Sequence, residues 1–207
     1  MCREHGYNIR WVFSDNLHFS DDSGKIFKGC RNPTTAPFKN EHYMDAINES
    51  TIIAKPMMKG FQFISKMQGT RILPSQSSDI PQNLAFLCTV NNAVIRVLIV
   101  NFKGKFQYRK AEEVRISLQN LPVEYNSCKL IKYILDSRHN NIYNLWVEAG
   151  RPSVPDDELV NKMHELEILI PSDTNIFPKE QISRGILTTI SPHSIVMLEI
   201  LPSGNVE

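Results

Sequence analysis

The 207-residue sequence lacks both a strong excess of charge and a long apolar run. It has 23 lysine and arginine residues against 22 aspartate and glutamate residues, for a formal net charge of +1 at pH 7. Without a positive field or a block of like charges, the chain is not expected to bind nucleic acid. The longest apolar run, Ala93–Val100, contains Arg96 and is far shorter than the roughly 20 residues of a membrane-spanning helix. Composition therefore predicts a globular chain of one or two domains with neither nucleic-acid nor membrane partners.

Patterns that bind metals or cofactors are also absent. The four cysteines are far apart, and none of the six histidines has the spacing of a metal-binding pair on one helix face. There is no glycine-rich phosphate loop and no G-x-S-x-G nucleophile motif. We therefore expect no metal and no cofactor. The disulfide state is left open for all four cysteines, which are Cys2, Cys30, Cys88 and Cys128.

From residue 70 onward the sequence has the pattern of an antiparallel β-structure. In Glu112–Leu118, valine, isoleucine and leucine alternate with charged and polar residues, which predicts one buried and one wet face. Asn91-Asn92 is a good hairpin turn because asparagine tolerates positive φ. Several short strands separated by turn signals predict a β-sandwich. The predicted strands are Thr70–Leu73, Asn83–Val90, Ala93–Asn101, Glu112–Leu118, Lys129–Leu135, Gly185–Ile190 and Ser194–Leu201.

A helix is predicted before these strands, beginning at Pro56 and ending near Gly69. Met57, Phe61 and Ile64 recur at spacings of four and three and are expected to face the core. The lysines of this segment fall on other sides of the helix and are expected to face water. The pattern is that of an amphipathic surface helix.

A second helical segment is predicted within the β-structure, at about residues 150–168. Its first turn, Asp156–Glu158, is acidic and complements the helix dipole, and Leu159 and Met163 form an apolar stripe. Lys179–Glu180 is expected to open the return to the sheet.

The N-terminal part carries the strongest candidate for a site. The apolar segment Asn8–Phe13 predicts a buried strand that runs directly into Ser14-Asp15-Asn16, as at the edge of a sheet. Residues 20–45 then read as a long loop, which in compact domains is often functional. One strand and one helix cannot form a stable domain alone, so this part is expected to belong to something longer.

Acidic residues elsewhere do not form a convincing catalytic pair. Asp21-Asp22 and Glu112-Glu113 are expected to be solvated surface charge, and only Asp15 follows a strand directly. Asn48-Glu49-Ser50 is an N-glycosylation sequon, which favours a secretory route slightly. The N-terminus has no apolar segment of the kind found in signal peptides.

At this point the residues resemble a known family. WVFSDN (Trp11–Asn16), the loop with Phe27 and Arg31, and AKPMMKGFQFISKMQGTRI (Ala54–Ile72) resemble the end of the barrel in glycoside hydrolase family thirty-nine. Two further segments lean toward its α-L-iduronidase branch rather than its β-xylosidases. These are YILDS (Tyr133–Ser137) and AGRPSVPDDELVNKM (Ala149–Met163), which resembles a helix–loop–helix insertion in the iduronidase sandwich.

The resemblance implies a mixed fold in two parts. Residues 1–69 would be the last strand–helix unit of a (β/α)8 barrel, and residues 70–207 an antiparallel β-sandwich with the helical insertion. It implies a retaining exo-glycosidase that removes terminal α-L-iduronic acid from dermatan and heparan sulfate in lysosomes. Its catalytic glutamates would lie on barrel strands before Met1, so this chain alone is expected to be inactive.

The resemblance also implies substrate-binding residues. Asp15 matches an aspartate that binds sugar hydroxyls, and Arg31 an arginine that clamps the uronate carboxylate. Asn16 and His18 would either line the same pocket or fix the loop. A planar guanidinium suits bidentate binding of a carboxylate, which a uronic acid has and xylose lacks. Lys25 and Lys28 compete with Arg31 for this role.

Two alternatives remain open from the sequence. One is a β-xylosidase of the same family. The other is a non-catalytic β-sandwich that binds carbohydrate or protein, with Tyr143 and Trp146 as candidates for a sugar platform. Packing beside the inserted helix is the simpler explanation of those two aromatic residues. The oligomeric state is not predicted.

Overall fold

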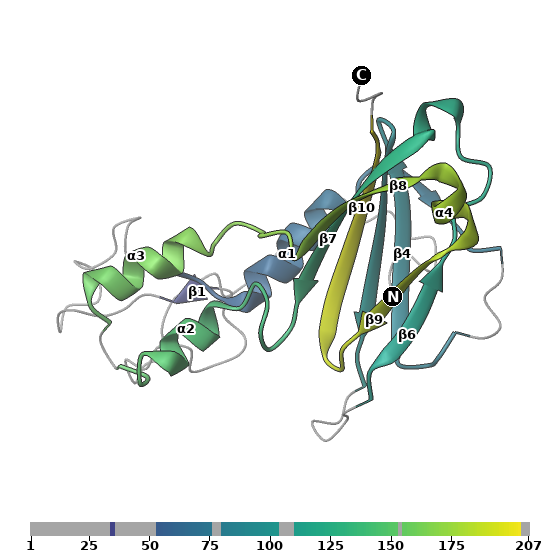
Figure 1. Ribbon diagram of the computed structural model, residues 1–207. Coiled ribbons are helices and arrows are strands. Elements are labelled where there is room, and N and C mark those ends of the chain that lie inside the picture. Colours follow the sequence, from purple (N-terminus) through teal and green to yellow (C-terminus); the bar gives the residue numbers. More distant parts are fainter. Residues whose placement is uncertain (1–33, 36–52, 76–79, 104–109, 153–154, 204–207) are drawn as a thin grey trace.

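The computed structural model describes residues 34–35, 53–75, 80–103, 110–152 and 155–203 (Figure 1). Strands, all paired antiparallel, are the commonest regular structure among these residues, and four α-helices lie around them. This confirms the predicted antiparallel character of the chain. Within this described part, no helix combines the length and the apolar content needed to cross a membrane.

A six-stranded antiparallel sheet forms the centre of the structure. Its strand order is β3-β4-β5-β10-β7-β8, so that β10 lies between β5 and β7 although it is the last strand in sequence. The strands are β3 (Thr70–Ile72), β4 (Leu84–Asn91), β5 (Val94–Asn101), β10 (Ser194–Pro202), β7 (Ser127–Leu135) and β8 (Asp173–Pro178).

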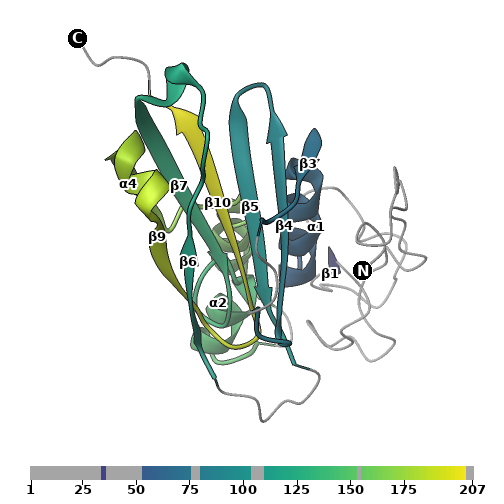
Figure 2. The ribbon, with the colours of Figure 1, turned by 90° about the vertical axis from the view of Figure 1, so that its right-hand side faces the viewer.

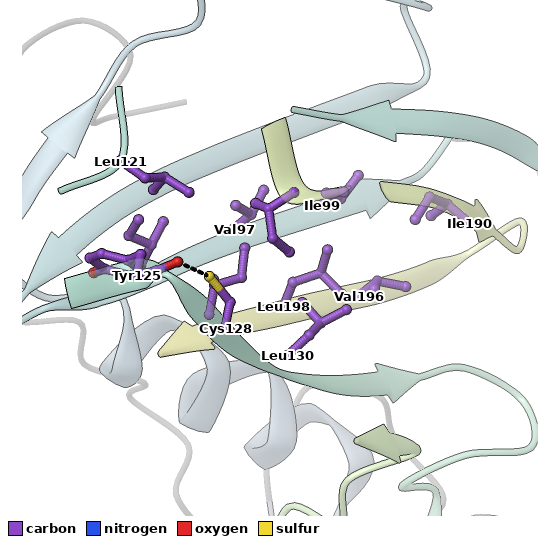
Figure 3. Close-up of a cluster of buried hydrophobic side chains, with 12 residues drawn as sticks. Val97, Ile99, Leu121, Tyr125, Cys128, Leu130, Ile190, Val196 and Leu198 are labelled. Atoms are coloured by element: carbon purple, nitrogen blue, oxygen red, sulfur yellow. Dashed lines mark hydrogen bonds between the residues drawn. The ribbon is translucent and has the colours of Figure 1, made fainter. Parts of the chain in front are cut away.

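A two-stranded sheet packs on one face of the large sheet. It consists of β6 (Glu112–Ile116) and β9 (Ile186–Ile190). Alternate residues of the long central strands, such as Val97 in β5 and Leu198 in β10, meet Ile190 of β9 in a buried apolar cluster (Figure 3). Tyr125 and Cys128 close one side of the cluster, where the Cys128 Sγ donates to the Tyr125 carbonyl oxygen at 3.3 Å. The alternation predicted for β6 is confirmed, because its apolar residues pack on this cluster.

Helix α1 (Pro56–Lys66) covers the opposite face of the large sheet (Figure 2). Phe63 and Met67, both 0% exposed, pack on Leu98, Tyr133 and Met197. In β5 and β10 the residues on this face alternate with those that face β6 and β9. The large sheet is therefore apolar on both faces and needs a cover on each.

The predicted buried face of α1 was wrong. Lys59, Phe63 and Met67 are fully buried, whereas Ile64 is 49% exposed and Met57 and Phe61 are only partly buried. Both sets have helical spacing, so periodicity did not separate them. Lys59 was expected to face the solvent because a buried charge is costly. In the structure its Nζ donates to the carbonyl oxygen of Ile168 instead.

The helix ends where it was predicted to end. Gly69 has φ +96°, and a Cβ there would lie 2.1 Å from the Val90 carbonyl oxygen. Only glycine therefore allows the chain to turn from α1 directly into β3 at this distance from β4.

The helical insertion contains two helices, of which one was predicted. Helix α3 (Asp157–Glu165) begins after Asp156, whose side chain accepts from the Leu159 N–H at 2.8 Å. Helix α2 (Ile142–Glu148) was missed, so the helical region begins before residue 150. Figure 1 shows both helices away from the six-stranded sheet.

Three further details differ from the sequence-based expectations. The residues at 179–180 open a short helix, α4 (Lys179–Arg184), rather than the strand itself. Strand β8 was not predicted because it lies at the sheet edge and is exposed along most of its length. The β4–β5 turn lies one residue later than expected, with positive φ at Asn92 and Ala93. The predicted strand Asn8–Phe13 and most of the loop 20–45 lie outside the described residues.

An ion pair is buried between α1 and the large sheet. Glu199 of β10 is 6% exposed, and its carboxylate accepts from the Arg96 Nε at 2.7 Å and lies 3.5 Å from the Lys66 Nζ. Lys66 also lies 5.6 Å from the centroid of the Tyr133 ring. Burial alone would raise the pKa of Glu199, but the Arg96 hydrogen bond and the nearby Lys66 charge outweigh it and lower that pKa. The charged carboxylate therefore stabilises the fold.

We expect Glu199→Gln to lower the free energy of unfolding at neutral pH by about 1.5–3 kcal/mol, because Arg96 loses its charged hydrogen-bond partner. The folded-state pKa of Glu199 is lowered, so its contribution is present above the ordinary glutamate range and is lost as pH falls. The difference from wild type should therefore shrink on acidification. Urea unfolding at several pH values measures it, with the exposed Glu113→Gln as matched control. A constant difference at every pH would contradict this account.

We expect Lys59→Met to remove a pH dependence of stability at alkaline pH. Burial lowers the pKa of Lys59 from 10.5 to about 8, while the nearby Glu167 carboxylate opposes the shift. Between these values the unfolded chain binds more protons than the folded chain, so wild-type stability rises with pH, by at most about 3 kcal/mol. Urea unfolding across this range compares wild type, Lys59→Met and the exposed-lysine control Lys129→Met. If the free energy of unfolding changed with pH in the same way in wild type and Lys59→Met, burial of the charged Lys59 would not destabilise the fold.

Candidate functional site

The residues predicted to bind substrate (Asp15, Asn16 and Arg31) or to carry a glycan (Asn48) lie outside the described residues. Lys25 and Lys28 lie outside them too. The structure does describe a short antiparallel ribbon that these residues adjoin in sequence. It consists of β1 (Thr34–Thr35), which begins three residues after Arg31, and β2 (Ile53–Ala54), which begins five residues after Asn48. The candidate region is therefore this ribbon, the N-terminal end of α1 and the elements packed on them.

The helical insertion supplies the apolar contacts of the ribbon. Ile53 of β2 is 0% exposed and packs in one cluster with Ile142 of α2 and with Val160 and Met163 of α3. A fully buried isoleucine is worth roughly 2 kcal/mol relative to an exposed one. The ribbon thus depends on residues about a hundred positions later in the sequence.

Glu167, just after α3, supplies the polar contacts. Its Oε1 accepts from the Ala54 N–H at 2.8 Å and lies 3.2 Å from the His164 Nδ1. Its carbonyl oxygen accepts from the Gln62 Nε2 at 3.0 Å. The next carbonyl oxygen, that of Ile168, accepts from the buried Lys59. The segment after α3 is therefore bonded to both β2 and α1.

The two aromatic residues considered for a sugar platform belong to α2. Their ring centroids lie 5.5 Å apart with planes 49° apart, so Tyr143 and Trp146 do not form a flat surface. Trp146 packs on the cluster around Ile53, and its Nε1 donates to the Pro152 carbonyl oxygen at 2.9 Å. These contacts tie α2 to the connection that leads to α3.

Several described carboxylates have identifiable local roles in the structure. Asp136 accepts from the backbone N–H groups of Arg138 and His139 in a turn. Among the described residues, no group of three or more histidine, cysteine, aspartate or glutamate side chains could hold a metal ion. Cys88 and Cys128 are free thiols.

Glu112 corrects a prediction, because it is not solvated surface charge. It is 7% exposed, lies 3.0 Å from the Lys110 Nζ and accepts from the Asn83 Nδ2 at 3.2 Å. Its position explains this, since it shares the inward side of β6 with Val114 and Ile116. Glu113, on the other side, is exposed as expected.

Sequence reasoning did not find Glu167 or the burial of Lys59. Both residues look like ordinary charges on an amphipathic or turn segment. Their partners are 105 to 113 positions away in sequence, in contacts that no local pattern records.

Comparison with known families gives a match of residues 10–175 to the model for glycosyl hydrolases family 39. Comparison with curated proteins gives no match. The match includes the segment with Asp15 and Arg31 and both helices of the insertion.

Among solved structures, the fold is similar to a bacterial orthologue of human α-L-iduronidase, with TM-score 0.63 and 14% identity over 85% of this chain and 32% of that one. It is also similar to a monomeric β-xylosidase from Caulobacter crescentus CB15, with TM-score 0.60 and 13% identity over 81% and 34% of the two chains. A family 39 enzyme from Xanthomonas axonopodis pv. citri gives TM-score 0.58 and 13% identity over 73% and 31%.

The chain spans about a third of the length of each of these solved proteins. At such identities the likeness establishes the fold, an antiparallel sheet structure with few helices. The family match covers most of the chain and is independent of that likeness. The chain therefore belongs to glycosyl hydrolases family 39.

Proposed function

We propose that this chain is part of a retaining glycoside hydrolase of the α-L-iduronidase type, which removes terminal α-L-iduronic acid from dermatan and heparan sulfate. The observation that carries the proposal is the family match over residues 10–175, which supports glycosidase activity in general. In this proposal residues 1–69 close a (β/α)8 barrel, and residues 70–207 form the β-sandwich that follows it. The similarity to an iduronidase orthologue and to a β-xylosidase is compatible with both substrates, so the choice between them rests on side chains.

The preference for a uronic acid rests on Arg31. A guanidinium can donate two parallel hydrogen bonds to a carboxylate, which gives both energy and orientation. Asp15 would accept hydrogen bonds from the sugar hydroxyls, and Asn16 would line the pocket beside it. Barrel enzymes carry their active groups at the carboxyl ends of strands, which is where Asp15 falls if Asn8–Phe13 is a barrel strand.

A retaining mechanism needs two carboxyl groups about 5–5.5 Å apart, one as nucleophile and one as acid and base. We assign neither role to a residue of this chain and place both on other barrel strands. The residues of this chain would bind and orient the sugar, so that its anomeric carbon faces the nucleophile. The proposal needs no metal and no cofactor.

The proposal extends to processing and location. Glycosylation at Asn48 and a lysosomal or secretory location would fit an enzyme that degrades glycosaminoglycans. The partner would be the oligosaccharide substrate, with no role for nucleic acid or a membrane.

The substrate class can be tested by binding to the purified chain. We expect methyl α-L-iduronide to give saturation-transfer NMR signals and methyl β-D-xyloside to give weaker ones or none. Arg31→Ala should reduce iduronide binding at least tenfold, because a charge-assisted hydrogen bond contributes about 1.5–3 kcal/mol. Lys25→Ala and Lys28→Ala are matched controls. Preference for the xyloside, absence of iduronide binding, or loss in a lysine variant instead would contradict the assignment.

Catalysis can be tested separately with an aryl α-L-iduronide. We expect the purified 207-residue chain to give no turnover above the uncatalysed rate, because both catalytic carboxylates are assigned to other strands. Release of the aryl group is followed by absorbance. Turnover that disappears on Asp15→Asn would show that this chain carries its own catalytic groups and would overturn that assignment.

A further inference from the structure

A row of polar residues crosses the face of the large sheet that α1 covers. Thr89 of β4 lies directly opposite Arg71 of β3 on one side and Arg96 of β5 on the other. Residues paired in this way point to the same face of a sheet. Arg96 in turn lies opposite Glu199 of β10, to which its Nε donates at 2.7 Å. The row therefore reads arginine, threonine, arginine, glutamate across four neighbouring strands (Figure 2).

This row carries more positive than negative charge. Lys66 of α1 lies 3.5 Å from the same Glu199 oxygen that accepts from Arg96, so two cations share one carboxylate. Arg71 adds a third cation on the same face. Arg71 also takes part in another interaction, but a guanidinium has five N–H donors and can serve several acceptors. Arg96 and Glu199 are mostly buried, where salt screens charges little, so the excess of positive charge favours an anion.

Thr89 supplies a second and independent observation. It is 1% exposed, and its Oγ1 has no hydrogen-bond partner among the described residues. Such a buried hydroxyl is costly, and in native structures it calls for an explanation such as a water or an ion. Arginine side chains have donors and no acceptor, whereas the threonine hydroxyl can rotate to donate. A group that bonds to Thr89 and to both arginines together must therefore be an acceptor.

The spacing of the strands suits a tetrahedral oxyanion at this place. Neighbouring strands lie about 4.8 Å apart, so the backbones of Arg71 and Arg96 are separated by about 10 Å, with Thr89 between them. Long side chains on both sides can reach one ion above the threonine, and a guanidinium binds such an ion through parallel hydrogen bonds. Arg71 is exposed on the edge strand, so its side chain can move to admit the ion.

We propose that Arg71, Thr89 and Arg96 form a binding site for a sulfate group, either as inorganic sulfate or as the sulfate ester of a saccharide. Lys66 adds positive charge beside it. The site rests on the described residues of the sheet and α1 alone, and it lies apart from the sugar-binding residues assigned above. Only the further step, that the sulfate ester belongs to a glycosaminoglycan, rests on the proposed function.

Titration followed by amide NMR tests the site in the 207-residue chain. Sodium sulfate replaces sodium chloride at constant ionic strength, so that general screening stays the same. We expect saturable shifts at the amides of Arg71, Thr89 and Arg96 and none in the β6–β9 sheet. Glucose 6-sulfate and glucose separate the two sources. Shifts with inorganic sulfate alone support a site for the free ion, and shifts with glucose 6-sulfate but not with glucose support a site for a sulfate ester.

Thr89→Val separates binding from stability. The change removes the hydroxyl but keeps the shape, so without sulfate the free energy of unfolding should stay equal or rise. The affinity for sulfate should nevertheless fall about threefold or more, because one hydrogen bond is lost. Thr188→Val is the matched control. Thr188 of β9 is also buried, and its Oγ1 also lacks a partner among the described residues, but it belongs to the small sheet.

Arg71→Gln tests the contribution of charge. We expect the affinity for sulfate to fall at least about tenfold, because a charge-assisted hydrogen bond is lost. Arg71 is exposed, so the variant should fold as wild type does. The matched control is Arg115→Gln, which removes an exposed arginine from β6 of the small sheet.

Three results would overturn the site. They are the absence of saturable shifts at Thr89, an unchanged affinity in Thr89→Val, and an equal loss in Thr188→Val or Arg115→Gln. The outcome is independent of the iduronide assay. A chain that binds sulfate but no iduronide refutes the proposed function alone, and a chain that binds iduronide but no sulfate refutes this site alone.

Discussion

The six-stranded sheet must be covered on both faces, and the rest of the structure follows from this constraint. Alternate residues of β5 and β10 point to opposite sides, and on both sides they are mostly large and apolar. The pair β6–β9 covers one face and α1 covers the other (Figure 2). Among the described helices, only α1 contributes fully buried apolar side chains to the cluster on its face of the sheet. It is therefore part of the hydrophobic core.

Charged groups mark the places where segments distant in sequence meet. Glu199 joins β10 to β5 and to the end of α1, while Glu167 joins the segment after α3 to β2 and to Gln62 of α1. Apolar contacts tolerate some sliding, whereas a hydrogen-bonded carboxylate accepts only a narrow geometry. The C-terminal end of α1 is therefore held by the Glu199 carboxylate, and its body is held by Phe63 and by the bonds of Lys59 and Gln62. This arrangement gives one helix a defined position between the sheets and the insertion.

Apolar runs and alternation predicted the strands from residue 70 onward except the edge strand β8, and they missed the two-residue strands β1 and β2. All seven strands predicted from residue 70 onward are present, but β8 was not predicted because it is exposed at the sheet edge. The face of α1 was wrong because Lys59 shares the spacing of Phe63, and a buried lysine needs a carbonyl partner that only the fold supplies. The site residues were inferred from motifs near Asp15 and Arg31. Glu167 gave no signal, since its role arises from contacts more than a hundred residues away.

Gly69 has a consequence for how this protein could be recombined with its relatives. Its positive φ and its close approach to the Val90 carbonyl oxygen restrict the connection between the end of α1 and β3 to one conformation. The end of α1 is consequently held close to β4, although the sequence analysis assigned the helix and the sheets to different parts of the chain. A chimaera that exchanges the N-terminal part of the chain should be joined ahead of Pro56, so that α1 stays with the large sheet on which it packs.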